Sequence, residues 1–446
     1  MSTIVDEIRS GRKHIGIFGI GYIGFSTACA YASRGVKVVA TDVDVERVKL
    51  FNEGRSTVPN MDFWVGYDTK YLVDSGVMGA TTDWEQLISP EVPVIFISVP
   101  TERDAMPFDD YILDVFTKLA TFKDVKMESK PIFIIESTIA RPVIDKVEAI
   151  LNADGQGWYV LGICNRRDWF GDAAHNLQTI PRILGVDDGE CRDVVKAIIE
   201  VVSPDVRLAP SVRDATLVKA LENALRATEI SVINQMATAF KQTDVIRIAE
   251  LAASKWNVGL FRPGYLAGYC LPVSFKYLML SGGNVNKLSI FSEVMNTNDN
   301  MPSEIVMAFY NRGVKRVAIL GMSYKADIPV STLSASIPIA DGFRHCGIEC
   351  AIHDPYFGAN YISEKAACGT FSFPDDLGKF DAILILADHR AYKSVPLEVL
   401  CEKTKNVRFI LDLTDLWLGK GLGKEYHRLG DAGWFGENFR APPGKV

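Results

Sequence analysis

Three glycines near the start of the chain have the types and spacing of a phosphate-binding turn. The run Gly19-x-Gly21-x-x-Gly24 follows an apolar segment at 14–18 and precedes a helix-like segment at 25–33. Gly19 permits a tight turn, Gly21 lets the backbone approach a pyrophosphate, and Gly24 lets the helix pack closely on the strand. The N-terminus of such a helix offers free N–H groups and a partial positive charge. The glycines therefore predict a dinucleotide site, with a purely structural turn as the alternative.

An acidic residue after the next strand indicates which dinucleotide binds. The segment 36–41 reads as a strand and ends at Asp42. Its carboxylate would accept hydrogen bonds from the ribose hydroxyls and would repel a 2′-phosphate. We expect no arginine nearby to compensate such a phosphate. The sequence therefore predicts NAD as the cofactor and a preference for NAD+ over NADP+.

Two further apolar segments, at 92–98 and 131–135, end in small polar residues. In a doubly wound sheet the ligand lies beyond the carboxyl ends of the strands, so these ends are expected to line the crevice. Plain turn chemistry is the alternative for any single residue. The predicted cofactor-binding residues are Gly19, Gly21, Tyr22, Ile23, Gly24, Asp42, Val99, Pro100, Thr101, Ser137 and Thr138.

A cysteine and a helical lysine–asparagine pair could carry covalent chemistry. Cys270 lies in a Gly/Pro-rich loop, whereas the other seven of the eight cysteines fall in or beside expected core elements. Buried free cysteines usually act as small apolar residues, but a loop thiol can attack an electrophilic carbon. Lys219 and Asn223 are four residues apart and share one helix face. A solvated helix face would explain this pair equally well.

The elements that must position these residues alternate between strand and helix at both ends of the chain. Between them, 214–240 reads as one long helix without Gly or Pro, followed by helices at 246–255 and 288–311. Further strands are expected at 315–321, 349–355, 380–386 and 407–412. The predicted fold class is α/β, with two Rossmann-like, doubly wound parallel-sheet domains joined by a long central helix and a small helical domain. We place the domains at 1–205, 206–311 and 312–446.

Composition limits the remaining classes of function. The chain has 446 residues, 48% hydrophobic and 23% charged, and a net charge of -7. An acidic chain has no overall basic field for a nucleic acid, and its dispersed cysteines and six histidines suggest neither a disulfide framework nor a metal site. No apolar run is long enough to span a membrane. We therefore expect a reduced, cytoplasmic protein that binds no nucleic acid, metal or membrane.

Several motifs, in one order, give the chain a more specific resemblance. They are Gly19-x-Gly21-x-x-Gly24 with Asp42, Val99-Pro100-Thr101-Glu102, Glu136-Ser137-Thr138, Arg166-Arg167-Asp168-Trp169-Phe170, Leu217-Val218-Lys219-x-x-Glu222-Asn223, Gly264-x-x-x-Gly268-x-Cys270-x-Pro272 and Gly321-Met322-Ser323-Tyr324-Lys325-Ala326-Asp327. Together they cover nearly the whole chain. The sequence resembles the nucleotide-sugar 6-dehydrogenases, the family of UDP-glucose and UDP-N-acetylhexosamine dehydrogenases, which would place it in polysaccharide biosynthesis.

The resemblance implies a four-electron oxidation of a sugar CH2OH to a carboxylate with two NAD+. Cys270 would be the nucleophile that forms a thiohemiacetal and then a thioester. Lys219 and Asn223 would stabilise the alkoxide, and Thr138 would position water. The substrate-binding residues implied for the UDP-sugar are Arg166, Arg167, Asp168, Lys219, Asn223, Gly264, Gly268 and Lys325. The apolar stripe of the long helix predicts a homodimer, with burial inside one monomer as the alternative.

Some positions depart from the family pattern. Ser274 stands where an aspartate is usual, and Thr332 stands in place of an arginine. No carboxylate precedes Asp168 in its segment, where the family often has a glutamate. If Lys219 lacks its carboxylate partner for this reason, Ser274→Asp should raise turnover. The alternative is that an aspartate buried there destabilises the fold.

The same comparison leaves the function partly open. Val273 is apolar, which favours a UDP-N-acetylhexosamine over UDP-glucose. The alternatives are a UDP-glucose 6-dehydrogenase and a catalytically weakened paralogue that binds NAD and nucleotide sugar. A 6-phosphogluconate-type or hydroxyacid dehydrogenase would share the first domain, but it needs neither Cys270 nor a second α/β domain.

Overall fold

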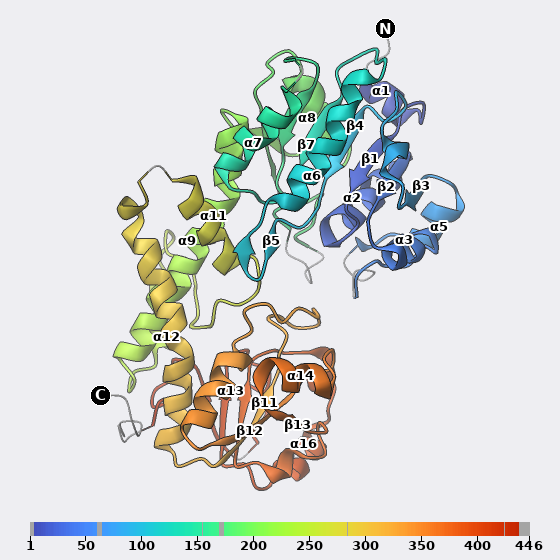
Figure 1. Ribbon diagram of the computed structural model, residues 1–446. Helices are drawn as coiled ribbons and strands as arrows, with labels where there is room; N and C mark the ends of the chain where they lie inside the picture. Colours follow the sequence, from blue (N-terminus) through green and yellow to red (C-terminus); the bar gives the residue numbers. More distant parts are fainter. Residues whose placement is uncertain are drawn as a thin grey trace. The chain divides into compact units, whose positions relative to one another are not determined.

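The chain forms two compact units, each with its own sheet (Figure 1). The computed structural model describes residues 4–59, 65–153, 155–168, 174–282, 284–422 and 424–436. The first unit comprises Met1–Glu222 and Val273–Gly283, and the second comprises Asn223–Pro272 and Asn284–Val446. The predicted fold class, two Rossmann-like α/β parts with a long central helix, is confirmed.

The first unit is built on an eight-stranded sheet in the order β10-β9-β8-β7-β4-β1-β2-β3. Its strands, in that order, are Val206–Leu208, Arg182–Val186, Val160–Ile163, Ile132–Ile135, Val94–Ile97, Ile15–Phe18, Val38–Thr41 and Met78–Thr81. Neighbouring strands are parallel except β8 and β9, which are antiparallel. Strand β1 lies between β2 and β4, so the order reverses there. In such sheets the ligand crevice opens at the carboxyl ends of the strands at this reversal.

Helices cover this sheet because its central strands are apolar on both faces and need a layer on each side. The helices are α1 Ile4–Arg9, α2 Tyr22–Ala32, α3 Val45–Asn52, α5 Thr69–Asp74, α6 Asp110–Leu119, α7 Arg141–Leu151 and α8 Arg192–Glu200, with short 3-10 turns η1 Trp84–Leu87 and η2 Ala120–Asp124. Helices α2 and α8 share one core with the strands, and α6 packs beside α7 (Figure 1). A small hairpin, β5 Glu102–Arg103 and β6 Met106–Pro107, follows β4.

The second unit carries a six-stranded, fully parallel sheet in the order β13-β12-β11-β14-β15-β16. Its strands, in that order, are Gly369–Thr370, Glu349–His353, Arg316–Leu320, Ala382–Ile385, Phe409–Asp412 and Glu425–Arg428. The helices around it are α13 Ser336–His345, α14 Ala359–Ala366, α15 Arg390–Lys393 and α16 Leu397–Lys403, with η4 Leu377–Lys379. Separate apolar cores fill the two sides of the sheet.

Four further helices carry the predicted helical segment. They are α9 Val212–Ala239, α10 Val245–Ala252, α11 Leu271–Ser281 and α12 Ser289–Asn311, with η3 Val285–Leu288. Helix α9 begins in the first unit and continues into the second, because the boundary falls between Glu222 and Asn223. Helix α11 was not expected from the sequence. No helix within the described ranges is long and apolar enough to cross a membrane.

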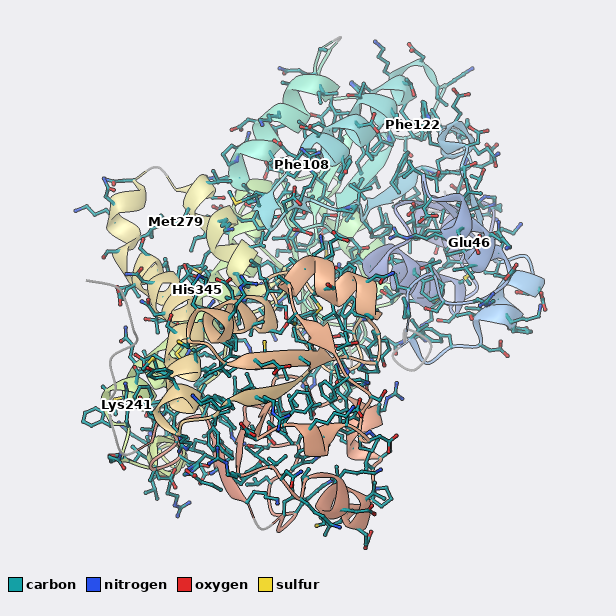
Figure 2. All side chains as sticks on the ribbon, turned by 60° about the horizontal axis from the view of Figure 1, so that its bottom comes forward. Glu46, Phe108, Phe122, Lys241, Met279 and His345 are labelled. Carbon is teal, nitrogen blue, oxygen red and sulfur yellow. The ribbon has the colours of Figure 1, made fainter. Side chains whose placement is uncertain are left out.

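Aromatic side chains contribute to the packing of both units. In the first, the ring of Phe122 lies 5.7 Å from that of Phe133, inside the core (Figure 2). In the second, the Lys241 ammonium lies 3.3 Å from the centre of the Phe435 ring and 2.9 Å from a Glu304 oxygen (Figure 2). The eight cysteines all lie in the described part of the chain, and none forms a disulfide.

Candidate active site

The glycine turn after β1 has the geometry that a dinucleotide requires. Gly19 has φ +87°, and a Cβ there would lie 2.8 Å from the Ser98 carbonyl oxygen. A Cβ on Gly24 would lie 1.8 Å from the Gly19 oxygen, so the helix can approach only with glycine. Gly21 precedes α2, no side chain caps that helix, and a Cβ there would meet nothing within 4 Å. Open space therefore adjoins the helix N-terminus, and these residues fit a pyrophosphate.

Asp42 is held in place at the end of β2. One carboxylate oxygen accepts from the Ile20 N–H at 2.9 Å and the other from the Asp44 N–H at 3.0 Å. The sequence-based expectation that no arginine lies nearby is wrong, because Arg47 Nη1 is 3.8 Å from an Asp42 oxygen. Asp44 caps the N-terminus of α3, so the helix begins only three residues after Asp42, and its first turn carries Arg47 close to the end of β2.

The arginine makes the cofactor preference depend on Asp42. We expect wild type to prefer NAD+, and Asp42→Asn to bind NADP+ about tenfold more tightly, equivalent to about 1.4 kcal/mol. Asparagine keeps an acceptor for the turn but removes the charge that repels a 2′-phosphate, and Arg47 can then meet that phosphate. Titration of both variants with both cofactors checks this. Adding Arg47→Met should cancel the gain, and an unchanged NADP+ affinity in Asp42→Asn would contradict the prediction.

The two predicted loops beyond β4 and β7 are bonded to each other. The Thr101 hydroxyl donates to the Thr138 carbonyl at 2.6 Å, and the Ser137 hydroxyl donates to the Val99 carbonyl at 2.6 Å. From α11, the Tyr277 hydroxyl donates to the Thr101 carbonyl at 2.6 Å. The structure thus brings these predicted residues together at the carboxyl ends of the strands.

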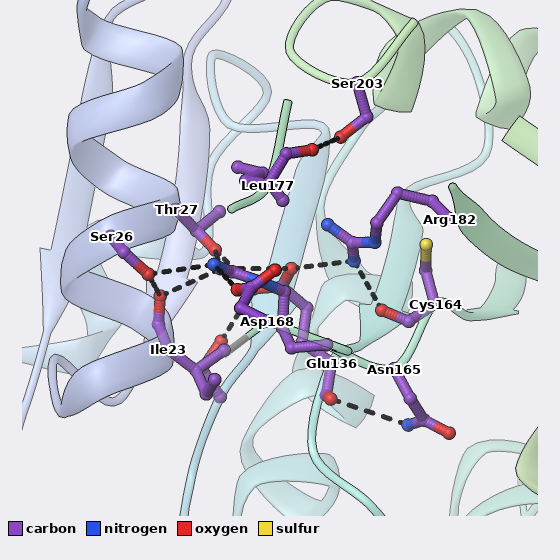
Figure 3. A network of polar contacts seen from close by, with 12 residues as sticks. Ile23, Ser26, Thr27, Glu136, Cys164, Asn165, Asp168, Leu177, Arg182 and Ser203 are labelled. Carbon is purple, nitrogen blue, oxygen red and sulfur yellow. Dashed lines mark hydrogen bonds and ion pairs between the residues drawn. The ribbon is translucent and has the colours of Figure 1, made fainter. Parts of the chain in front are cut away.

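Behind these loops, Glu136 lies in a buried ion cluster (Figure 3). One of its carboxylate oxygens accepts from the Thr27 hydroxyl at 2.6 Å and from the Ser98 hydroxyl at 3.0 Å. The other accepts from Arg182 Nη2 at 3.1 Å. A buried carboxylate needs such partners, so Glu136 joins the ends of β7 and β4 to helix α2. Neither Glu136 nor Arg182 was predicted as a site residue.

Arg166 belongs to the same cluster, because its Nη1 lies 3.9 Å from a Glu136 oxygen. Its guanidinium donates to the Thr27 hydroxyl at 2.6 Å and the Ser26 hydroxyl at 3.0 Å, both on α2, and pairs with Asp168. Its side chain is only 2% exposed. Two arginines and two carboxylates balance the charge, as burial requires. The last residues of this motif, Trp169 and Phe170, lie outside the described residues.

Arg167, the next residue, points to a different helix. Its Nε donates to a Glu222 oxygen at 2.7 Å, and the other Glu222 oxygen lies 3.3 Å from Lys219 Nζ. Arg167 Nη1 also donates to the Pro181 carbonyl at 2.7 Å. The expectation that Lys219 lacks a carboxylate partner is wrong, because Glu222 supplies one from the next turn of α9. Its spacing of three residues in the sequence was the available signal.

The cysteine loop lies in the second unit, together with Asn223. Cys270 is exposed and directly precedes α11, and its carbonyl oxygen is 3.5 Å from the Asn223 amide nitrogen. A helix N-terminus favours negative charge at this position. By contrast, Cys164 is fully buried, and burial raises the pKa of its thiol. Lys219 and Thr138 belong to the first unit.

The glycine loop packs against the segment that carries Lys325. Gly268 has φ +77°, and its N–H donates to the Thr332 carbonyl at 2.9 Å. A Cβ on Gly268 would lie 2.5 Å from the Tyr324 ring, so only glycine fits. A cavity of about 130 Å³ lies here within the second unit. It is lined by Gly264, Tyr265, Ala267, Ser323, Tyr324, Ser334, Ala335, Leu386 and Leu413.

The loop after β11 repeats the arrangement seen after β1. Asp354, which follows β12, accepts from the Met322 and Ser323 N–H groups at 2.7 Å each. Gly321 has φ +108°, and Gly19, at the corresponding place after β1, also has a positive φ. An acid at the end of the second strand therefore holds the turn after the first strand in both units. This fixes the backbone shortly before Lys325.

Two buried asparagines hold the glycine loop and were missed in the sequence. Asn234 of α9 exchanges two hydrogen bonds with Gly264, at 2.8 and 2.9 Å. Asn298 of α12 does the same with Leu266, at 2.7 and 3.2 Å. An amide on the apolar face of a long helix was the available signal, because a buried polar group needs partners.

Removal of one clamp should weaken the loop. Asn298→Ala leaves the buried N–H and carbonyl of Leu266 unpaired, so we expect unfolding free energy to fall by about 2 kcal/mol or more. Turnover should fall as well, because Cys270 ends the same loop. Denaturant unfolding measures the first effect. Asn300→Ala, exposed on the same helix, is the control, and equal stability of the two variants would contradict the prediction.

Comparison with known proteins finds one family whose models match most of the chain. Three models of one family match in order: the UDP-glucose/GDP-mannose dehydrogenase NAD binding domain at 13–203, the central domain at 213–300 and the UDP binding domain at 318–418. A UDP-N-acetyl-D-mannosamine dehydrogenase of Methanococcus aeolicus is 26% identical, over 86% of this chain and 87% of that protein. A UDP-N-acetyl-D-glucosamine 6-dehydrogenase of Pseudomonas aeruginosa is 23% identical, over 90% and 96%.

Solved structures share the fold. That of a UDP-D-ManNAc dehydrogenase from Pyrococcus horikoshii has a TM-score of 0.79 at 22% identity, covering 94% of this chain and 99% of that one. A UDP-N-acetyl-mannosamine dehydrogenase from S. aureus has a TM-score of 0.75 at 21% identity, covering 95% and 99%. The family models and curated relatives confirm the predicted kind of enzyme, an NAD-dependent nucleotide-sugar dehydrogenase, and the chain belongs to the UDP-glucose/GDP-mannose dehydrogenase family.

Proposed function

We propose that this enzyme oxidises the C6 CH2OH of a UDP-N-acetylhexosamine to a carboxylate through a covalent intermediate on Cys270. The observation that carries the proposal is the exposed Cys270 at the start of α11, with Asn223 at its backbone. Relatives named as UDP-N-acetylmannosamine and UDP-N-acetylglucosamine dehydrogenases support the acetylated sugar, as does the apolar Val273.

The chemistry divides between the residues as follows. Bound NAD+ supplies the hydride acceptor for each of the two oxidations. Lys219 and Asn223 stabilise the negative charge on the sugar oxygen by charge and by hydrogen bonding. The Cys270 sulfur adds to the aldehyde carbon, so the intermediate stays bound while the cofactor is exchanged. That addition gives a thiohemiacetal, and loss of its hydride to a second NAD+ would give the thioester. Water positioned by Thr138 attacks this thioester, which releases the carboxylate and regenerates the thiol.

Substrate binding is assigned to the predicted residues that lie outside the buried cluster of Glu136. Gly264, Gly268 and Lys325 would hold the nucleotide and sugar in the second unit, and Arg167 would act from the first. Arg166 and Asp168 serve the buried cluster, so we remove them from the substrate set.

The proposal also covers the oligomeric state and the cellular compartment. We assign a cytoplasmic homodimer, supported by exposed apolar side chains on α9: Leu221 at 46%, Leu225 at 53% and Val232 at 53%. We also propose three functional domains with the bounds predicted from the sequence: an NAD-binding domain at 1–205, a central helical domain at 206–311 and a UDP-sugar-binding domain at 312–446.

A substrate panel tests the proposed function. The purified protein is incubated with NAD+ and UDP-N-acetylmannosamine, UDP-N-acetylglucosamine, UDP-glucose or a hydroxyacid, and NADH and acid are both measured. We expect two NADH per acid and the highest kcat/KM with an N-acetylhexosamine. Binding of a UDP-sugar without NADH formation would identify a catalytically weakened paralogue, and turnover of hydroxyacids alone would overturn the proposal.

A further inference from the structure

We propose that Glu222 is the counter-ion that positions the Lys219 ammonium for the reaction, and that Arg167 anchors Glu222. Neither Glu222 nor Arg167 touches the reacting atoms in this role, so both are positioning residues. The inference rests on the proposed function, which assigns Lys219 to the substrate oxygen.

The geometry of Glu222 distinguishes it from an ordinary helical ion pair. A lysine–glutamate pair three residues apart on an exposed helix face contributes little, because both side chains lose rotamer freedom. Here each Glu222 oxygen has its own partner: Lys219 Nζ at 3.3 Å and Arg167 Nε at 2.7 Å. The carboxylate is therefore fixed from outside the helix as well as within it.

Arg167 is itself anchored. Its Nη1 donates to the Pro181 carbonyl at 2.7 Å, directly before the strand that carries Arg182. The side chains of Lys219, Arg167 and Glu222 are 16%, 24% and 30% exposed, so water screens the three charges only partly. Such a chain holds the ammonium at a defined point yet leaves it reachable, as a group that stabilises a transient oxyanion must be.

The neighbouring arginines of this segment have separate tasks. Arg166 bonds to Ser26 and Thr27 on α2, the helix behind the glycine turn, whereas Arg167 bonds to Glu222 on α9. The segment 165–168 therefore fixes the cofactor helix with one arginine and the lysine helix with the next. Among the described residues, Glu222 is the carboxylate that forms an ion pair with Lys219.

Kinetics of single and double variants test the proposal. We expect Glu222→Gln to lower kcat about tenfold or more. Arg167→Met should also lower kcat, and Glu222→Asp should keep more of the wild-type kcat than Glu222→Gln does. The Kd of NAD+, measured by direct titration, should stay unchanged. Glu229→Gln, which removes an exposed carboxylate two turns further along α9, is the matched control and should keep the wild-type kcat.

A double-variant cycle separates positioning from stability. Because Glu222 acts through Lys219, Glu222→Gln should have no further effect on kcat in the Lys219→Met background. Additive losses would overturn the inference, as would wild-type kcat in Glu222→Gln while Lys219→Met is inactive. If Lys219→Met itself turns over at the wild-type rate, the assigned role of Lys219 fails instead. Thermal unfolding of each variant identifies losses that come from unfolding alone.

Discussion

Cys270→Ser is expected to abolish net acid formation, by at least about 10³-fold, while leaving NAD+ affinity unchanged. A serine hydroxyl is a much weaker nucleophile than a thiol, so the aldehyde is no longer held covalently and the second oxidation lacks its thioester. The glycine turn, Asp42 and α2 belong to the first unit, whereas Cys270 belongs to the second. Acid formation and NAD+ titration on the same preparation check both halves of the prediction.

The other exposed cysteine provides the matched control. Cys401→Ser removes a thiol from α16 and should keep full turnover. Mass spectrometry of wild type incubated with NAD+ and the UDP-sugar should detect a sugar adduct on the peptide that contains Cys270. Acid formation by Cys270→Ser at the wild-type rate would end the covalent mechanism.

The fold could be read from the sequence at most of the strands that are buried on both faces, although the buried β8 was not predicted. Continuous apolar segments gave β1, β4, β7 and β11 within a few residues of their observed bounds. The segment of β9 escaped this pattern because its first residue is Arg182, whose charge is paired with the distant Glu136. Helix α11 escaped it because Pro272 follows a glycine-rich loop, although proline is tolerated in a first helical turn.

The site was predictable where short spacing encodes geometry. The glycine turn, Asp42 and the Lys219–Asn223 spacing depend on neighbouring residues, and the structure places them as expected in their elements. The role of Arg166 depends on Thr27, 139 residues away, and no local pattern specifies such a contact. The clamp between Asn298 and Leu266 is likewise non-local. Polar pairs inside the core are therefore what the sequence alone does not determine.

Ser274→Asp is expected to lower the unfolding free energy by about 3 kcal/mol or more and to give no gain in turnover. Ser274 is 3% exposed in α11, between Val273 at 0% and Phe275 at 2%. A carboxylate at this buried position would lose its hydration. Lys219 already has a carboxylate partner in Glu222, so an added aspartate fills no vacancy. The expected result is therefore the opposite of the rise in turnover that we would expect if Lys219 had no carboxylate partner.

Stability and turnover together decide between the two outcomes for Ser274→Asp. Denaturant unfolding measures the first and NADH formation the second, with Ser254→Asp as the control because Ser254 is exposed beyond α10. The control should change stability little, since an exposed carboxylate keeps its hydration. Higher turnover at unchanged stability in Ser274→Asp would contradict the prediction. It would mean that a second carboxylate beside Lys219 improves catalysis and that Glu222 alone is not sufficient. Lower stability without a gain in turnover would mean that α11 does not accommodate a charge at position 274 and that Glu222 suffices as the carboxylate partner of Lys219.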